Sequence, residues 1–194
     1  MFFRDLQMKK GVQLDVSMAE VRLPVRLGHR DAQATFAEPL SQQLAAASLG
    51  MVSEIKAHET APSDICGITM YLAMTDVSRR SLETVGGMLT QLHAPIGSSI
   101  RTSIGGEPVL FGGAEGLELS VDTAVTPDAI CRKELAKSCA LAMKDFAISR
   151  GWARRADRTL FYFYGESFQR MQDTIERLTQ SDPSFSTATA RRLA

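Results

Sequence analysis

The order of strand and helix patterns along the chain predicts an α+β fold of two tandem halves with mainly antiparallel sheets. Alternating apolar and polar residues indicate strands, and apolar residues spaced by three or four indicate helices. Both patterns recur in the order βαββαβ, which is the split βαβ unit of ferredoxin-like folds. That order fits twice into the 194 residues. The sequence therefore predicts two successive ferredoxin-like halves.

The first half opens with a half-buried strand at 20–27, where Val21, Leu23 and Leu27 alternate with polar residues. Pro24 favours an edge position for this strand, because proline cannot donate to a ladder. The same two patterns predict a helix at 35–48, strands at 51–57 and 65–74, a helix at 77–93 capped by Asp76, a strand at 99–104 and a hairpin strand at 109–111. A polar turn containing Pro62 separates the second and third strands.

The second half repeats the order. We expect a strand at 116–122, a helix opened by Thr126-Pro127-Asp128 and running towards Arg150, short and long strands at 152–154 and 159–164, a helix at 167–179 and a last strand at 187–193. We place the first half with its hairpin at residues 1–113 and the second at 114–194. The connection around Gly112 and Gly113 is short, so we expect the second half to pack against the first.

Composition excludes several classes of protein. Apolar residues make up 44% and charged residues 23% of the chain, and 22 basic residues balance 22 acidic ones, so net charge predicts no polyanionic partner. The three cysteines match no zinc motif and are typical of a reducing compartment, which favours the cytoplasm. Residues 1–10 lack the apolar run of a signal peptide, and no stretch is long enough to predict a membrane span.

No catalytic constellation can be assembled from the sequence. Ser167 lies between a strand and a helix, as the nucleophile of hydrolases does, but Gln169 stands where that elbow needs glycine. We expect Ser167 to cap the helix instead. The three histidines occupy separate elements, without the spacing of a metal site. We therefore expect no enzyme activity, no cofactor and no metal.

Two segments are candidates for binding. His29, Arg30 and Asp31 follow the first strand and form a polar loop suited to partner contacts, although an ordinary solvated turn is the favoured interpretation of these residues alone. The triplet echoes the catalytic loop of protein kinases, yet the downstream asparagine of that loop is absent. Gly113 and Glu115, in the connection between the halves, are further candidate partner contacts.

The strand at 159–164 is aromatic on both faces, with Phe161 and Phe163 on one side and Tyr162 and Tyr164 on the other. We prefer a core between the two halves for the tyrosine face, because an exposed aromatic strand favours aggregation. The alternative is a single-stranded RNA-binding face, on which aromatic rings stack bases beside a basic patch. The residues of that alternative are Tyr162, Tyr164, Arg154, Arg155 and Arg158.

Three runs carry a resemblance to a known group of proteins: VRLPVRLGHRD at 21–31, LHAPIGSS at 92–99 and LFYFYGESF at 160–168. They resemble uncharacterised bacterial proteins of the immunity type, which are found with toxin systems. The resemblance implies a protein that binds and blocks a cognate toxin and that performs no catalysis. It carries over no functional residue.

Our first hypothesis is therefore a non-enzymatic, cytoplasmic protein that binds another protein, as an immunity factor neutralising a bacterial toxin. Two alternatives remain open at this point. One is a single-stranded RNA-binding module that uses the aromatic strand. The other is a small-molecule sensor that holds its ligand between the two halves.

Overall fold

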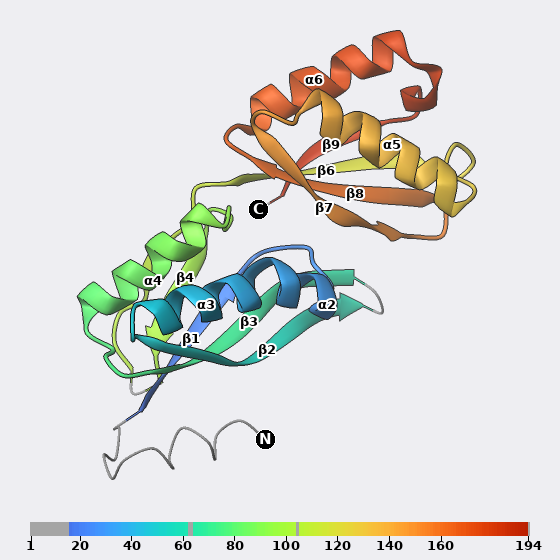
Figure 1. Cartoon of the computed structure of the whole chain (residues 1–194). Helices are drawn as coiled ribbons and strands as arrows, with labels where there is room; N and C mark the ends of the chain where they lie inside the picture. Colours follow the sequence, from blue (N-terminus) through green and yellow to red (C-terminus); the bar gives the residue numbers. More distant parts are fainter. Residues whose placement is uncertain (1–15, 62–63, 104, 194) are drawn as a thin grey trace.

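The computed structural model describes residues 16–61, 64–103 and 105–193. The predicted turn at Pro62 and residues 1–10 lie outside this range. The chain forms two antiparallel sheets, one of five strands in the order β2-β3-β1-β4-β5 and one of four in the order β7-β8-β6-β9 (Figure 1). The first four strands of each half have the ferredoxin-like order, so the predicted fold class is confirmed. β5 is an added edge strand of the first sheet.

The elements of the first half are β1 (Ser17–Leu23), α2 (His29–Ala32), the π-helical turn η1 (Gln33–Ala37), α3 (Glu38–Ala46), β2 (Gly50–Ala61), β3 (Asp64–Met74), α4 (Arg79–Gln91), β4 (Ser98–Thr102) and β5 (Val109–Phe111). β1 is a central strand paired with β3 and β4, so the edge position predicted from Pro24 is wrong. The strand ends at Leu23, and the missing N–H of Pro24 therefore interrupts no ladder.

The first helical segment begins earlier than the sequence pattern predicts. α2, η1 and α3 follow one another without a break from His29 to Ala46. Ala32, Phe36, Leu40 and Leu44 are fully buried, so the four-residue apolar spacing extends one turn towards the N-terminus. His29, Arg30 and Asp31 therefore form the exposed first turn of a helix and not a loop.

The second half contains β6 (Glu115–Asp122), α5 (Ala129–Ala142), β7 (Ala147–Arg154), β8 (Arg158–Gly165), α6 (Phe168–Ser181), the 3-10 turn η2 (Pro183–Phe185) and β9 (Thr189–Leu193). α5 ends well before Arg150, and β7 is much longer than predicted, because Ala147 already pairs with Gly165 of β8. A register shift between Ser149 and Trp152 interrupts the alternation that marks a strand.

The two faces of β8 belong to two different cores. Phe161 and Phe163 pack with β6, α5 and α6 inside the second half. Leu160, Tyr162 and Tyr164 belong to the core cluster of the first half. Figure 1 shows the resulting layers: the first sheet, its helices, the second sheet, and then α5 and α6. The core between the halves predicted for the tyrosine face is therefore present.

Among the described residues, this layering places no element over one face of the first sheet. The helices of the first half lie between the two sheets, so the outer face of the first sheet points away from the other described elements (Figure 1). Among the described residues, no helix is both long and apolar enough to cross a bilayer.

Candidate functional site

The predicted contact residues lie in two separate places. His29, Arg30 and Asp31 are exposed on the first turn of α2. Gly113 and Glu115 lie at the junction of the halves, where Glu115 begins β6 and lines a cavity that none of the three α2 residues lines. The structure therefore does not bring the two candidate segments together into one site.

The connection around Gly113 is bound to the first half. The backbone N–H groups of Gly113 and Ala114 donate to the Ala94 carbonyl at 3.1 and 3.2 Å, and Ile96 N donates to the Ala114 carbonyl at 2.9 Å. Gly112 has a φ of +93°, and a Cβ there would overlap the carbonyl oxygen of Pro95. This close backbone approach explains the glycine and fixes the exit of the chain into β6.

The two tyrosines of the aromatic strand, which the RNA-binding alternative needs on the surface, are buried. Tyr162 and Tyr164 are only 5% and 1% exposed and lie in the core, so no base can stack on them. The Arg158 guanidinium donates to groups of Ser120, Thr187 and Thr189. Arg154 and Arg155 are exposed at the end of β7, away from any aromatic platform that these tyrosines could form.

Polar groups also hold this core between the halves together. The Tyr164 hydroxyl accepts a hydrogen bond from the Arg26 backbone N–H at 2.9 Å, and burial raises the pKa of this phenol to about 12. Arg150 of β7 donates to the Leu92 carbonyl at 2.9 Å, and its guanidinium lies 5.2 Å from the centre of the Phe36 ring. Burial lowers the pKa of Arg150. These contacts tie the second sheet to the helical layer of the first half.

The outer face of the first sheet is a polar surface that no other described element covers. The strand register arranges its side chains in two rows, which we call the open face. One row is Lys56, Thr69, Arg22 and Ser99, and the other is Glu54, Tyr71, Glu20 and Arg101. The sequence signal for this face is the polar half of the alternation in β1, whereas the strand pattern of β3 predicts only an apolar run.

Ion pairs fix the charges of the open face. Glu20 receives hydrogen bonds from Arg22 at 2.5 Å and from Arg101 at 3.0 Å. Partial burial raises the pKa of Glu20. The hydrogen bonds and charges of the two arginines outweigh it, so the pKa of Glu20 lies below its ordinary value. Lys56 lies 3.2 Å from Glu54, and its ammonium is 4.9 Å from the centre of the Tyr71 ring. The face is therefore a mosaic of both charges around one aromatic ring.

The open face is hollowed beside Tyr71. A depression of about 480 Å³ is lined by Glu20, Arg22, His58, Thr69, Tyr71 and Ser99, with Pro24 and Gly97 at its end. His58 Nε2 lies 2.7 Å from Thr69 Oγ1, which holds the imidazole along the wall.

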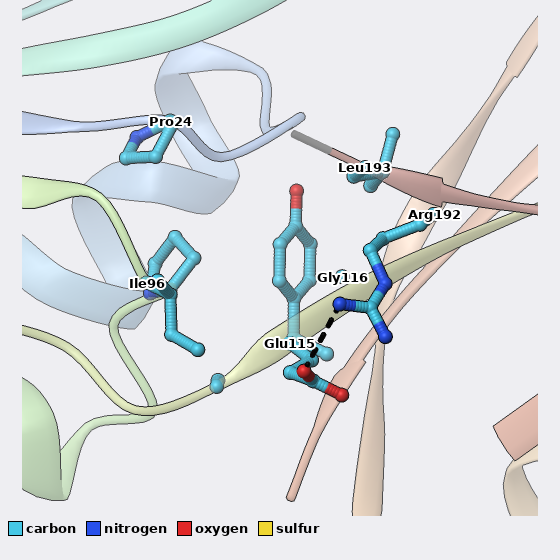
Figure 2. Close-up of a pocket in the computed structure, with 9 residues that line it drawn as sticks. Pro24, Ile96, Glu115, Gly116, Arg192 and Leu193 are labelled. Atoms are coloured by element: carbon cyan, nitrogen blue, oxygen red, sulfur yellow. Dashed lines mark ion pairs between the residues drawn. The ribbon is translucent and has the colours of Figure 1, made fainter. Parts of the chain in front are cut away.

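A smaller cavity of about 210 Å³ lies at the junction of the two halves (Figure 2). Pro24, Pro95 and Ile96 line it from the first half, and Glu115, Arg192 and Leu193 line it from β6 and β9. Figure 2 shows the Glu115–Arg192 ion pair on the side opposite Pro24 and Ile96. The sequence indicated Glu115 but gave no signal for Arg192, because the two meet only through the pairing of β9 with β6.

The described residues contain no group of three or more histidine, cysteine or acidic side chains that could hold a metal ion. Ser167 is the N-cap of α6 and accepts from the Arg170 backbone N–H, as the sequence predicts. Its hydroxyl is therefore engaged in capping the helix.

Comparison with known proteins gives no family. No protein-family model matches the chain, and no curated protein does. The solved structures to which the chain is similar include two that it covers along most of their length. One is the regulatory subunit of aspartate kinase from Thermus thermophilus in ligand-free form, with 17% identity, coverage of 84% of this chain and 92% of that chain, and a TM-score of 0.27. The other contains the first two RRM domains of the yeast poly(U)-binding protein Pub1, with 12% identity, coverage of 91% and 99%, and a TM-score of 0.26. TM-scores this low indicate no function.

Proposed function

We propose that this chain is a non-enzymatic protein-binding protein of the immunity type, which neutralises a toxin by covering it with the open face of the first sheet. The observation that carries the proposal is the fixed charge mosaic on that face. Charges held in place by ion pairs offer a partner an ordered pattern to match, which favours specific association. Tyrosine and arginine, the residues most enriched at interface centres, lie together there as Tyr71, Arg22 and Arg101.

The size of the face suits a protein partner. Five strands about 4.8 Å apart span roughly 20 Å across the sheet, and the five residues of β4 and seven of β1 give a length of roughly 17–24 Å, shorter at the three-residue edge strand β5. Because protruding side chains add accessible area, the accessible surface of the face approaches the roughly 800 Å² that each partner contributes to a standard interface. The depression beside Tyr71 adds a place for an anchoring side chain.

The same mosaic disfavours RNA as the partner. The two rows carry three basic residues and two acidic ones, Glu20 and Glu54, so the face has little net positive charge. They offer one ring, that of Tyr71, whereas single-stranded RNA is held by several stacked bases and a basic groove. A protein partner is thus favoured over RNA by charge and by aromatic content.

The test is affinity capture of the tagged full chain from its native host, with mass spectrometry of bound protein and sequencing of bound RNA. Wild type is compared with Arg22→Glu combined with Tyr71→Ala, and with the control Arg80→Glu on the helical side. We expect one protein to be captured in stoichiometric amount by wild type and by the Arg80→Glu control. The double variant should fail to capture it. Co-expression should then relieve the growth arrest caused by that protein. Enriched RNA, or a partner retained by the double variant after its fold is verified by circular dichroism, would refute the proposal.

A further inference from the structure

The cavity between the halves combines an apolar wall with a pair of opposite charges. Pro24, Pro95 and Ile96 form the wall on the side of the first half, and Leu193 extends it from β9 (Figure 2). Ile96 is 56% exposed, which is unusual for a large apolar side chain in this protein. Its side chain therefore offers apolar surface at the mouth of the cavity that the fold leaves uncovered.

Each charge of the cavity is held in place by a second contact. One carboxylate oxygen of Glu115, Oε2, accepts from the Phe168 backbone N–H at the start of α6. The Arg192 guanidinium lies 4.8 Å from the centre of the Phe168 ring. Both groups are therefore oriented without relying on each other.

The contact between the two charges is itself loose. Arg192 Nη1 lies 3.4 Å from Glu115 Oε1, longer than the roughly 2.7–2.9 Å of a strong charge-assisted hydrogen bond. Glu115 Oε1 can therefore accept a stronger hydrogen bond from a donor of a ligand, and the Arg192 guanidinium can donate a stronger one to an acceptor of a ligand. A ligand with a negative and a positive end can satisfy both groups better than they satisfy each other.

The volume limits the size of that ligand. At about 30 Å³ per water molecule, 210 Å³ corresponds to about seven waters, or a ligand of about six to eight non-hydrogen atoms. This is below the roughly 300–1,000 Å³ of sites for drug-sized molecules. A zwitterion of this size with an apolar remainder is a small aliphatic α-amino acid.

We propose that this cavity binds a free aliphatic α-amino acid of the size of alanine, proline or valine. Its carboxylate pairs with the fork of Arg192, its ammonium pairs with Glu115 Oε1, and its side chain contacts Pro24 and Ile96. Because the walls come from both halves, the bound ligand stabilises their packing by mass action. The site goes beyond the protein-binding function proposed above and does not depend on it.

The full chain tests this proposal through thermal denaturation and isothermal titration calorimetry with L-alanine, L-proline and L-valine. At a concentration of one hundred times Kd, we expect the melting temperature to rise by about 5 °C or more. N-acetyl-L-valine lacks the ammonium, and L-valine amide lacks the carboxylate. Each should therefore bind at least about tenfold more weakly than L-valine.

Matched variants assign the binding to the cavity. Arg192→Gln should weaken binding at least about tenfold. Arg170→Gln is the control, because Arg170 also pairs with a carboxylate, Glu166 at 3.5 Å, and also lies over a ring, Phe146 at 4.1 Å, but does not line the cavity. Glu115→Gln provides a second variant that keeps an oxygen for the Phe168 N–H while removing the charge.

Three outcomes would overturn the proposal. In the first, none of the three amino acids shows saturable binding. In the second, the two blocked analogues bind as tightly as L-valine, and in the third, Arg170→Gln loses as much affinity as the cavity variants do. Each is distinguishable from a failure of the proposed function, because the capture experiment changes only the open face. A cavity variant that loses the ligand and still retains the protein partner supports both sites independently.

Discussion

Replacing Tyr164 with phenylalanine removes a single oxygen from the packing between the two halves. That oxygen accepts the Arg26 backbone N–H at 2.9 Å, and the tyrosine side chain belongs to a residue that is 1% exposed. The phenylalanine ring fills the same space, so the substitution leaves no large cavity. What changes is the backbone N–H of Arg26, which loses this acceptor at a part-buried position beside the cavity that Tyr164 also lines.

The expected cost follows from that lost acceptor. An unsatisfied buried donor costs about 1–3 kcal/mol, so the free energy of unfolding should fall by that amount. With a urea m-value of about 2–3 kcal/mol/M, the unfolding midpoint should decrease by about 0.3–1.5 M. In a protein of this size, the melting temperature should decrease by about 2–4 °C for each kcal/mol.

The chain contains its own reporter for this experiment. Its single tryptophan, Trp152, lies on β7 in the second half, so its fluorescence follows that half, while far-UV circular dichroism follows both. Tyr164 belongs to the core cluster that joins the halves. We therefore expect both signals to shift by the same amount of urea.

The control is Tyr71→Phe, which removes the hydroxyl of a half-buried tyrosine on the open face. Its effect should remain within about 0.5 kcal/mol. If Tyr164→Phe matches this control, the hydrogen bond to Arg26 contributes nothing to the packing of the halves. If only the fluorescence midpoint shifts, the two halves unfold independently, and the reasoning about a shared core fails.

Three further substitutions or treatments test other parts of the fold. Asp76→Ala should destabilise the protein at about pH 7 but not in acid, because hydrogen bonds led by the Ser81 hydroxyl lower the pKa of Asp76. That stabilisation is present above the ordinary value of 3.8 and is lost as the pH falls through the lower folded-state pKa, so urea curves at about pH 7 and about pH 2.5 compare the two conditions. Gly112→Ala should cost about 3 kcal/mol or more in thermal denaturation, because its φ is +93° and the new Cβ would overlap the Pro95 carbonyl oxygen. The Cys139 thiol, whose pKa burial raises to about 12, should resist thiol reagents in the native protein and react in urea, as mass spectrometry can detect.

The strands were predictable from the sequence where only one face of the strand is buried. Val21 and Leu23 alternate with polar residues, and the structure buries both of them in a strand whose register follows that alternation. The boundary between α5 and β7 was not predictable. Ile130 and Leu141 are exposed apolar residues on α5, so the helix carries no clean stripe that marks its end. Gly151 has a φ of +108° within β7, beside the register shift that hides the alternation.

The sites were less predictable because they depend on which surfaces the halves cover. The sequence placed Tyr162 and Tyr164 on one face of a strand but left a core and an RNA platform both open, and only the packing of the halves decides between them. The cavity combines Pro24, Glu115 and Arg192 from distant parts of the chain. Periodicity carries no information on such long-range contacts, so Glu115 was indicated only as a loop residue.

The difference between the two sheets is the reason that the proposed partner is placed on the first one. β8 is apolar on both faces, so the second sheet must be covered on both sides, by its own helices and by the first half. A partner reaching its inner face would expose Tyr162 and Tyr164, which together bury about 300–500 Å². At about 25 cal/mol/Å², this costs up to about 8–12 kcal/mol, comparable with the whole stability of a typical domain. β1 instead alternates between buried and more exposed residues, so a partner can contact the open face while the buried residues of this strand stay in place.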